Sequence, residues 1–220
     1  MDLYEALYTT RAMRRVKPDP ISVEIQDRIL DAAIRAPSGG NSQDWRFLMV
    51  DDAEVIGRVA PLYQECIAML WSSIYNERIE AANADPEAEE SKQMLAIQRS
   101  VDYAAANFSD YPLLMFAFSR GDSTGGSIYP AVWSAQLAAR AEGVGSSLTS
   151  VLLLKGDEVP NLLGVPTDEG WQMAGMVPMG YPKGRWGVAK RAPVHEVGYR
   201  NRWGNPVTTI DEPLWSPEAG

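Results

Sequence analysis

The chain has 220 residues, of which 45% are hydrophobic, so it is long enough for one substantial core and too short for two domains of ordinary size. Its 29 acidic residues against 20 basic ones give a formal net charge of −9, which opposes binding to nucleic acid. The single cysteine, Cys66, excludes an internal disulfide framework and fits a cytoplasmic location, and no stretch is apolar enough to predict a membrane span.

Helical and strand patterns account for the first part of the chain. Apolar residues at helical spacing predict a helix over residues 22–34, in which Ser22 is the N-cap. A small polar loop follows it, and the aromatic and branched residues of 45–50 predict a buried strand. Residues 53–81 indicate a further helix that is broken or kinked at Pro61.

The other predicted elements fill the chain as far as Gly180. In order, they are an acidic surface crossing over 83–90, a helix over 91–106, a strand over 112–118, a helix over 129–142 that Gly143 closes, a strand over 145–154, helical turns over 157–163 and a strand over 171–179. Helices outnumber strands, and their order does not alternate as a wound parallel sheet requires. We therefore expect an α+β fold.

Beyond Gly180 the chain becomes rich in turns and carries three scattered tryptophans, Trp186, Trp203 and Trp215. Large aromatic side chains without a helical pattern need another surface to cover them. We therefore expect this tail to wrap a partner subunit.

Several kinds of catalytic site lack their residues. The one histidine, His195, and the one cysteine lie far apart in the sequence, so neither a histidine-based triad nor a metal site is expected. His195 is interpreted as a packed or surface residue and Cys66 as a core thiol. The chain also lacks a Walker phosphate loop, and its glycine pairs do not match the dinucleotide-binding fingerprint.

Basic residues gather near both ends of this acidic chain. The two clusters are Arg11, Arg14, Arg15 and Lys17, and then Lys183, Arg185, Lys190 and Arg191. On spacing alone, these clusters are either solvated surfaces or parts of a site for a specific anion.

The loop SGGNSQ, residues 38–43, is the segment least suited to packing. Ser38, Asn41 and Gln43 offer hydroxyl and amide groups, while the two glycines permit close approach of the backbone. Such a loop suits a ribityl chain or a pyrimidine edge. The alternative is an ordinary turn between a helix and a strand, which needs fewer of these residues.

Five segments carry a resemblance to a known family: RAMRRV, ILDAAIRAPSGGNSQDWRFLMV, PAVWSAQLAARAEGVGSS, GVPTDEGWQMAGMVPMGYP and KRAPVHEV. In these segments the chain resembles the nitroreductase family of FMN-dependent oxidoreductases over nearly its whole length. The resemblance implies a sandwich whose central, mainly antiparallel sheet is flanked by helices, in an intertwined homodimer with two FMN sites at the subunit interface. It also implies an FMN-binding core over residues 1–182 and, over 183–220, a phosphate clamp and dimer-wrapping extension of the same domain.

The resemblance assigns cofactor roles by position. Arg11 looks like the ligand of the FMN phosphate and Arg14 like that of the flavin pyrimidine edge, with Ala12 and Met13 on the same segment. The other implied roles belong to Ser38, Asn41 and Gln43, which line the flavin, to Thr149 and Ser150, whose backbone N–H groups approach flavin N5, and to Lys190 and Arg191, the C-terminal phosphate clamp.

One departure from the family concerns the phosphate. Members commonly have Arg-Arg-Ser where this chain has Thr10-Arg11-Ala12, which removes one cation and one hydroxyl from the phosphate shell. Either the phosphate site is weaker, or Arg15 or Arg185 compensates.

The function that the resemblance implies is electron transfer from NADH or NADPH, through FMN, to a small flat acceptor such as a nitroaromatic or a quinone in a ping-pong cycle. The flavin carries the chemistry and Arg14 acts electrostatically, so no side chain is needed as an acid or a base. The alternative function is a non-catalytic protein that binds or stores a flavin or a deazaflavin.

Three aromatic residues of the segment between Leu62 and Asn107 are candidates for the acceptor pocket. They are Trp71, Tyr75 and Tyr103. The alternative for each of them is packing at the dimer interface.

Overall fold

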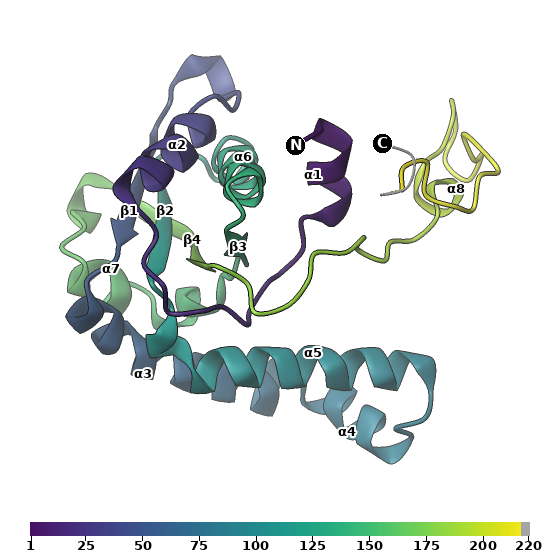
Figure 1. Ribbon diagram of the computed structural model, residues 1–220, viewed down its shortest axis with the longest axis horizontal. Coiled ribbons are helices and arrows are strands. Elements are labelled where there is room, and N and C mark those ends of the chain that lie inside the picture. The colour runs from purple at the N-terminus through teal and green to yellow at the C-terminus, as the bar shows by residue number, and fades with distance from the viewer. Residues whose placement is uncertain (217–220) are drawn as a thin grey trace. The chain divides into compact units, whose positions relative to one another are not determined.

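The structure, a computed structural model, describes residues 1–216 and divides into two units of internal contacts (Figure 1). Residues 12–184 form the larger one, here called the core unit. The smaller one, here called the terminal unit, combines residues 1–11 with the chain from Arg185 onward. Of the tail predicted over 183–220, residues 217–220 lie outside the described part.

The core unit contains a four-stranded antiparallel sheet in the order β1-β2-β4-β3. Its strands are β1 (Trp45–Val50), β2 (Leu113–Ser119), β3 (Gly145–Ser146) and β4 (Gln172–Gly180). Every residue of β2 is buried. The continuous apolar sequence of this strand follows from that position, because both of its faces are covered by helices.

Helices cover both faces of the sheet (Figure 1). On one face, α2 (Val23–Ala33) and α6 (Ile128–Ala141) pack against the β2 residues Leu113, Met115 and Ala117. On the other face, α3 (Ala53–Met69) and α5 (Glu89–Ala106) pack with Leu114, Phe116 and Phe118. This alternation along β2 confirms the predicted α+β sandwich.

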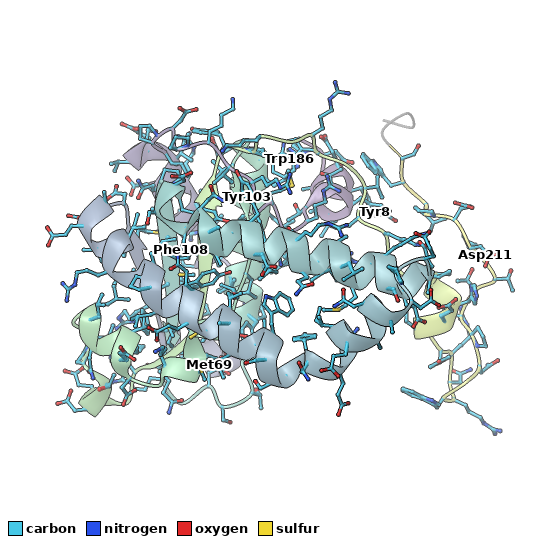
Figure 2. All side chains as sticks on the ribbon, turned by 90° about the horizontal axis from the view of Figure 1, so that it is seen from below. Tyr8, Met69, Tyr103, Phe108, Trp186 and Asp211 are labelled. Atoms are coloured by element: carbon cyan, nitrogen blue, oxygen red, sulfur yellow. The ribbon has the colours of Figure 1, made fainter. Side chains whose placement is uncertain are left out.

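Short helices complete the description. They are the 3₁₀-helices Gly39–Asn41, Phe108–Asp110, Val151–Lys155 and Thr167–Glu169, the π-helix Leu70–Ile74, α1 (Leu3–Thr9), α4 (Asn76–Ala84), α7 (Glu158–Leu162) and α8 (Val194–Val197). Figure 2 shows α3 and α5 side by side, with Phe108 beside them. In the described residues 1–216, no helix is both long and apolar enough to cross a membrane.

Of the two alternatives predicted at Pro61, a break or a kink, the break is wrong. Helix α3 begins at the N-cap Asp52, whose carboxylate accepts hydrogen bonds from the N–H groups of Glu54 and Val55, and it continues through Pro61. A proline inside a helix costs about 3 kcal/mol. Burial of neighbouring side chains, such as Val59 and Tyr63, offsets that cost, and the α-helix gives way to the π-helix only at Leu70.

The predicted strand over 145–154 is also wrong beyond its first residues. Only Gly145 and Ser146 belong to β3, and Val151–Lys155 forms a 3₁₀-helix. Val151 and Leu152 are buried in the same cluster as residues of α3, so the chain leaves the sheet to place them there. A short apolar run does not distinguish these two ways of burying it.

The terminal unit joins both ends of the chain. The backbone N–H of Ala189 donates to the carbonyl of Tyr8 at 3.0 Å, and the rings of Tyr8 and Trp215 lie 5.5 Å apart. Trp203 is 92% exposed. The partner subunit expected to cover this tail remains a prediction.

Candidate functional site

A cavity of about 240 Å³ in the core unit contains several of the residues assigned to the flavin or to its acceptor. Its wall comes from the segment before α2, from α3, the π-helix, α4 and α5, and from the segment after β3. The lining residues are Arg14, Tyr63, Ile67, Leu70, Trp71, Tyr75, Arg78, Met94, Ile97, Val101, Ser147, Leu148, Thr149 and Val151. We call it the Arg14 cavity.

The backbone around Arg14 is held on two sides. The N–H of Met13 donates to the carbonyl of Ser146 at 3.0 Å, and the hydroxyl of Tyr111 donates to the carbonyl of Arg14 at 2.9 Å. Gly145 permits this approach, because a Cβ at that position would lie 2.8 Å from the Cβ of Met13. Met13 itself is buried, so its side chain serves packing.

The segment after β3 presents two unpaired backbone donors. The N–H groups of Ser147 and Thr149 donate to β4, to the carbonyls of Pro178 at 3.2 Å and of Met176 at 2.9 Å. The alternate N–H groups, of Leu148 and Ser150, have no partner within residues 1–216. An edge of this kind offers donors to a ligand.

This pattern changes one sequence assignment. The N–H of Thr149, which was expected to approach flavin N5, is already donated to Met176. Along an extended segment, successive N–H groups point in opposite directions. The donors of this segment without a partner within residues 1–216 are therefore those of Leu148 and Ser150.

Two buried tyrosines belong to the surroundings of the cavity: Tyr63 lines it, and Tyr111 binds the carbonyl of Arg14. Burial raises the pKa of the Tyr63 phenol, and the positive charge of Arg14 and a hydrogen bond with Thr149 oppose that shift only in part. Burial likewise raises the pKa of Tyr111. Both phenols are therefore neutral hydrogen-bonding groups at physiological pH.

The aromatic candidates separate into two places. Trp71 and Tyr75 line the Arg14 cavity, with their rings 5.7 Å apart, and the indole N–H of Trp71 donates to Asp102 at 2.7 Å. Tyr103 lies outside the lining. Its ring is 4.7 Å from the guanidinium of Arg15, and its hydroxyl accepts a hydrogen bond from Lys183 at 3.3 Å.

The loop 38–43 forms hydrogen bonds within itself and does not line the Arg14 cavity of its chain. The N–H of Gln43 donates to the hydroxyl of Ser38, and the side-chain amide of Gln43 donates to that of Asn41. Asn41 and Gln43 have φ angles of 55° and 52°, in the left-handed region that side chains disfavour. Asparagine adopts this region more readily than other residues, so Gln43 is the more unusual of the two. Strained backbone conformations cluster at functional sites.

In the terminal unit, the structure brings Arg11 to the segment of the C-terminal clamp. The guanidinium of Arg11 donates to the carbonyl of Arg185 at 3.0 Å. Lys190 and Arg191 line a cavity of about 500 Å³ in the same unit, together with Tyr8. Ala12 belongs to the core unit, where it forms a bridge to Ser146.

Neither the histidine nor the cysteine lines the Arg14 cavity. His195 lies beside Asp211, at 3.3 Å between Nδ1 and the carboxylate, and Cys66 is buried in the core. Burial raises the pKa of the Cys66 thiol, which disfavours the nucleophilic thiolate.

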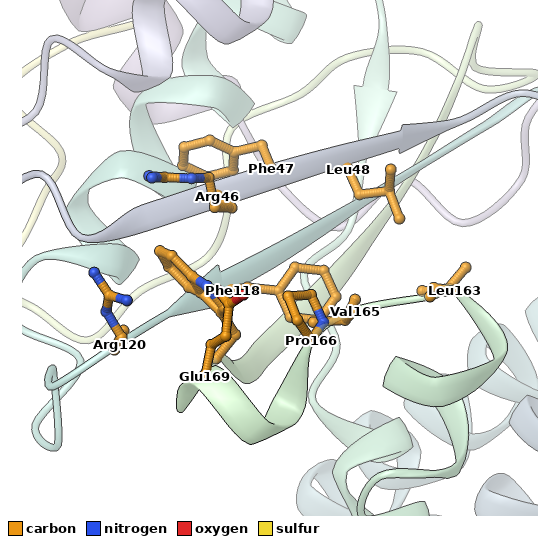
Figure 3. Close-up of a pocket in the computed structure, with 11 residues that line it drawn as sticks. Arg46, Phe47, Leu48, Phe118, Arg120, Leu163, Val165, Pro166 and Glu169 are labelled. Atoms are coloured by element: carbon orange, nitrogen blue, oxygen red, sulfur yellow. The ribbon is translucent and has the colours of Figure 1, made fainter.

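A second cavity of the core unit, of about 470 Å³, lies at one end of β1 and β2 (Figure 3). Figure 3 shows Arg46 and Arg120 at one side of it and Leu163 at the other. Both guanidiniums lie over the ring of Trp171, at 4.7 and 4.9 Å, and Arg120 is paired with Asp44. None of the residues assigned from the sequence lines this cavity.

Comparisons with known proteins support the family. A sequence model described as the nitroreductase family matches residues 7–181. The chain is 29% identical over 216 residues to the 5,6-dimethylbenzimidazole synthase of Rhodospirillum rubrum. This match covers 94% of this chain and 93% of that protein.

Two solved structures share the fold. Iodotyrosine deiodinase bound to FMN and 3-iodo-L-tyrosine superposes with a TM-score of 0.67 at 22% identity, over 91% of this chain and 99% of that one. The FMN-dependent nitroreductase NfnB of Mycobacterium smegmatis, in complex with NADPH, gives a TM-score of 0.65 at 22% identity, over 91% of this chain and 100% of that one.

Proposed function

Because the chain belongs to the nitroreductase family, we propose that it is an FMN-dependent oxidoreductase that takes a hydride from NADH or NADPH and reduces a small flat acceptor. With a quinone as acceptor, NAD(P)H and one proton supply two electrons and two hydrogens, and the products are NAD(P)⁺ and the hydroquinone. A nitro group would lose one oxygen as water in the same exchange. Bound FMN would supply the hydride and electron transfer chemistry.

The observation that carries this proposal is the composition of the Arg14 cavity. Its lining includes Arg14, which the resemblance assigns to the flavin, and Leu148, whose N–H has no partner within residues 1–216. The aromatic residues of the lining are Tyr63, Trp71 and Tyr75. Aromatic walls stack on flat rings, while the cation and the N–H donors fix the orientation of polar edges. These residues bind and orient, and none of them has to move a proton.

One further observation fits a phosphorylated cofactor. The hydroxyl of Thr10 is buried and has no hydrogen-bond partner within residues 1–216. Buried polar atoms nearly always have a partner, so a ligand oxygen is a reasonable one for this hydroxyl next to Arg11. We propose that Arg11, Lys190 and Arg191 bind the FMN phosphate, with Thr10 partly replacing the residues absent from the family pattern.

The loop 38–43 motivates the proposal of a homodimer. Its polar residues are held in a strained, ordered conformation by bonds such as that from the N–H of Gly39 to the hydroxyl of Ser127, yet they do not line the cavity of their own chain. In the resemblance, the two flavin sites lie at a subunit interface. We propose that Ser38, Asn41 and Gln43 serve the flavin bound to the partner subunit.

Anaerobic stopped-flow reduction of the purified, FMN-loaded protein tests the main proposal. We expect NADH or NADPH to bleach the visible absorbance of oxidised flavin, and addition of a quinone or a nitroaromatic to restore it. A holoprotein that keeps its flavin but bleaches with neither nucleotide would contradict the oxidoreductase and favour the flavin-binding alternative.

A second candidate function rests on the similarity to 5,6-dimethylbenzimidazole synthase, which extends over 94% of the chain. Aerobic incubation of the protein with excess FMN and NADPH, followed by mass spectrometry for 5,6-dimethylbenzimidazole, tests it. Formation of that product would make the synthase the better assignment.

The phosphate assignment gives a prediction for Arg191. Loss of one charge-assisted contact costs about 1.5 to 3 kcal/mol, so Arg191→Ala should weaken FMN affinity by roughly tenfold or more. The measurement is the flavin-to-protein ratio after gel filtration. Arg202→Ala is the matched control in the terminal unit, since the exposed Arg202 forms only backbone hydrogen bonds within residues 1–216. Full flavin occupancy in Arg191→Ala would show that the phosphate is bound elsewhere.

A further inference from the structure

The charges that line the Arg14 cavity are of one sign. Two guanidiniums, those of Arg14 and Arg78, belong to the lining, and no carboxylate does among the described residues that form it. Neither arginine forms an ion pair within residues 1–216. Most of the remaining wall is apolar or aromatic, which strengthens electrostatic interactions inside the cavity.

Arg78 is placed by the helix that follows the π-helix. It lies in the first turn of α4, three residues after Tyr75, and its guanidinium carbon is 5.4 Å from the centre of the Tyr75 ring. The ring holds the guanidinium by a cation–π contact and leaves its hydrogen-bond donors free for another group.

Acidic residues do lie near Arg78, but none of them belongs to the described lining of the cavity. Glu77, the residue before Arg78, forms no ion pair with it within residues 1–216. Glu80, on the same helix, accepts a hydrogen bond from the side-chain amide of Asn76 at 3.0 Å. Asp102, which approaches the rim, accepts the indole N–H of Trp71 at 2.7 Å. The positive charge of Arg78 is thus left without a counter-charge in the lining.

The two arginines serve different partners in this arrangement. The proposed function uses Arg14 for the flavin, so Arg78 remains for the molecule that enters the cavity. A protein with a net charge of −9 repels anions in general, and a cation at the cavity provides local attraction against that field.

We propose that the acceptor is a flat aromatic molecule that bears a carboxylate, and that Arg78 binds this carboxylate. The planar guanidinium matches a carboxylate in a two-point contact, while Trp71 and Tyr75 hold the aromatic ring. The inference rests on the proposed function, because it names the class of acceptor for the same site. Arg78 determines which acceptor binds and takes no part in the transfer itself. Electrons and protons still pass from NAD(P)H and one proton to the acceptor, as described for the proposed function.

Paired acceptors test this inference in the FMN-loaded protein. The pair is 4-nitrobenzoate and the neutral 4-nitrobenzamide, which have the same shape and differ in charge. We expect the wild type to prefer the benzoate by roughly tenfold in kcat/KM, which corresponds to one charge-assisted contact. Arg78→Gln should bring the ratio of the two kcat/KM values close to one.

Arg99→Gln is the matched control. Arg99 is an exposed residue of α5 and lies outside the cavity lining. Its substitution removes the same charge from the protein as Arg78→Gln does. This variant should keep the preference of the wild type. An equal loss of preference in both variants would mean that only the general field matters, and would overturn the assignment to Arg78.

Binding without turnover separates this inference from the proposed function. Isothermal titration of the holoprotein with benzoate and with benzamide, neither of which accepts electrons here, should show tighter binding of benzoate that Arg78→Gln removes. If the protein reduces both nitro compounds without a charge preference, and benzoate binds no more tightly than benzamide, the carboxylate inference fails while the function stands. If benzoate binds through Arg78 and no acceptor is ever reduced, the function fails and the anion site stands.

Discussion

Arg14→Gln is expected to lower kcat/KM by roughly 100-fold with every acceptor, because a charge aimed at a developing negative charge contributes about that much. Arg14 lines the cavity from a segment that is held by two hydrogen bonds, from the N–H of Met13 to Ser146 and from the hydroxyl of Tyr111 to the carbonyl of Arg14. The same variant should make the midpoint potential of bound FMN more negative, since reduction leaves negative charge at the pyrimidine edge. Stopped-flow kinetics and spectroelectrochemistry at saturating FMN measure the two effects.

The comparison with Arg14→Lys separates charge from geometry. Lysine keeps the charge and loses the planar pair of donors, so the potential should return most of the way to the wild-type value while kcat/KM recovers only in part. A wild-type potential and a wild-type kcat/KM in Arg14→Gln, at full flavin occupancy, would refute the electrostatic role of this residue.

The elements that the sequence predicted correctly are those with the clearest apolar pattern. The strand over 45–50 has the predicted bounds, and helix α2 begins after Ser22 as expected. The buried Ile29 and Ala33 of α2 recur at helical spacing, and the strand is rich in aromatic and apolar residues; both are signals that a sequence carries. Ser22 nevertheless makes no side-chain capping bond, so the helix start depends on the period more than on the cap.

The errors arose where tertiary contacts decide between local alternatives. The cost of Pro61 inside α3 is offset by packing that is not local to the helix, and the end of β3 is decided by where Val151 and Leu152 find a core. Neither contact is encoded within the few residues that a pattern examines. The π-helix at Leu70, in the wall of the Arg14 cavity, has no sequence signature either.

For the site, resemblance located the segments and the structure distinguished residues within them. Arg14, Trp71, Tyr75 and Thr149 do line one cavity. The direction of each N–H after β3 depends on the register with β4, which only pairing reveals, so Leu148 was missed. Arg78, the carboxylate ligand proposed above, was no candidate at first because an exposed arginine on an acidic helix gives no signal in sequence. Its significance comes from the absence of a carboxylate in the described lining.

The aromatic cluster beneath the site links stability to geometry. Phe108 is only 1% exposed, and its ring lies 4.5 Å from that of Tyr63 and 5.8 Å from that of Tyr111. Tyr63 lines the Arg14 cavity, and Tyr111 holds the carbonyl of Arg14. One buried ring therefore supports both residues that position the cavity.

Phe108→Ala is expected to reduce the free energy of unfolding by about 3 to 5 kcal/mol, since truncation removes buried area and leaves a void. Chemical denaturation followed by circular dichroism measures it. Val23→Ala is the control, because Val23 is an apolar residue of the core unit whose side chain is 63% exposed. This substitution should change the free energy of unfolding by less than about 0.5 kcal/mol.

Phe108→Leu decides whether the cavity depends on this ring in particular. Leucine fills much of the space but cannot stack on Tyr63, so it should cost less stability than alanine, while the support under Tyr63 and Tyr111 is loosened. We therefore expect kcat/KM to fall in Phe108→Leu at a temperature where the variant is fully folded. A leucine variant with lowered stability and unchanged kcat/KM would mean that the ring contributes to the core alone, and that the position of Arg14 is fixed by its backbone bonds.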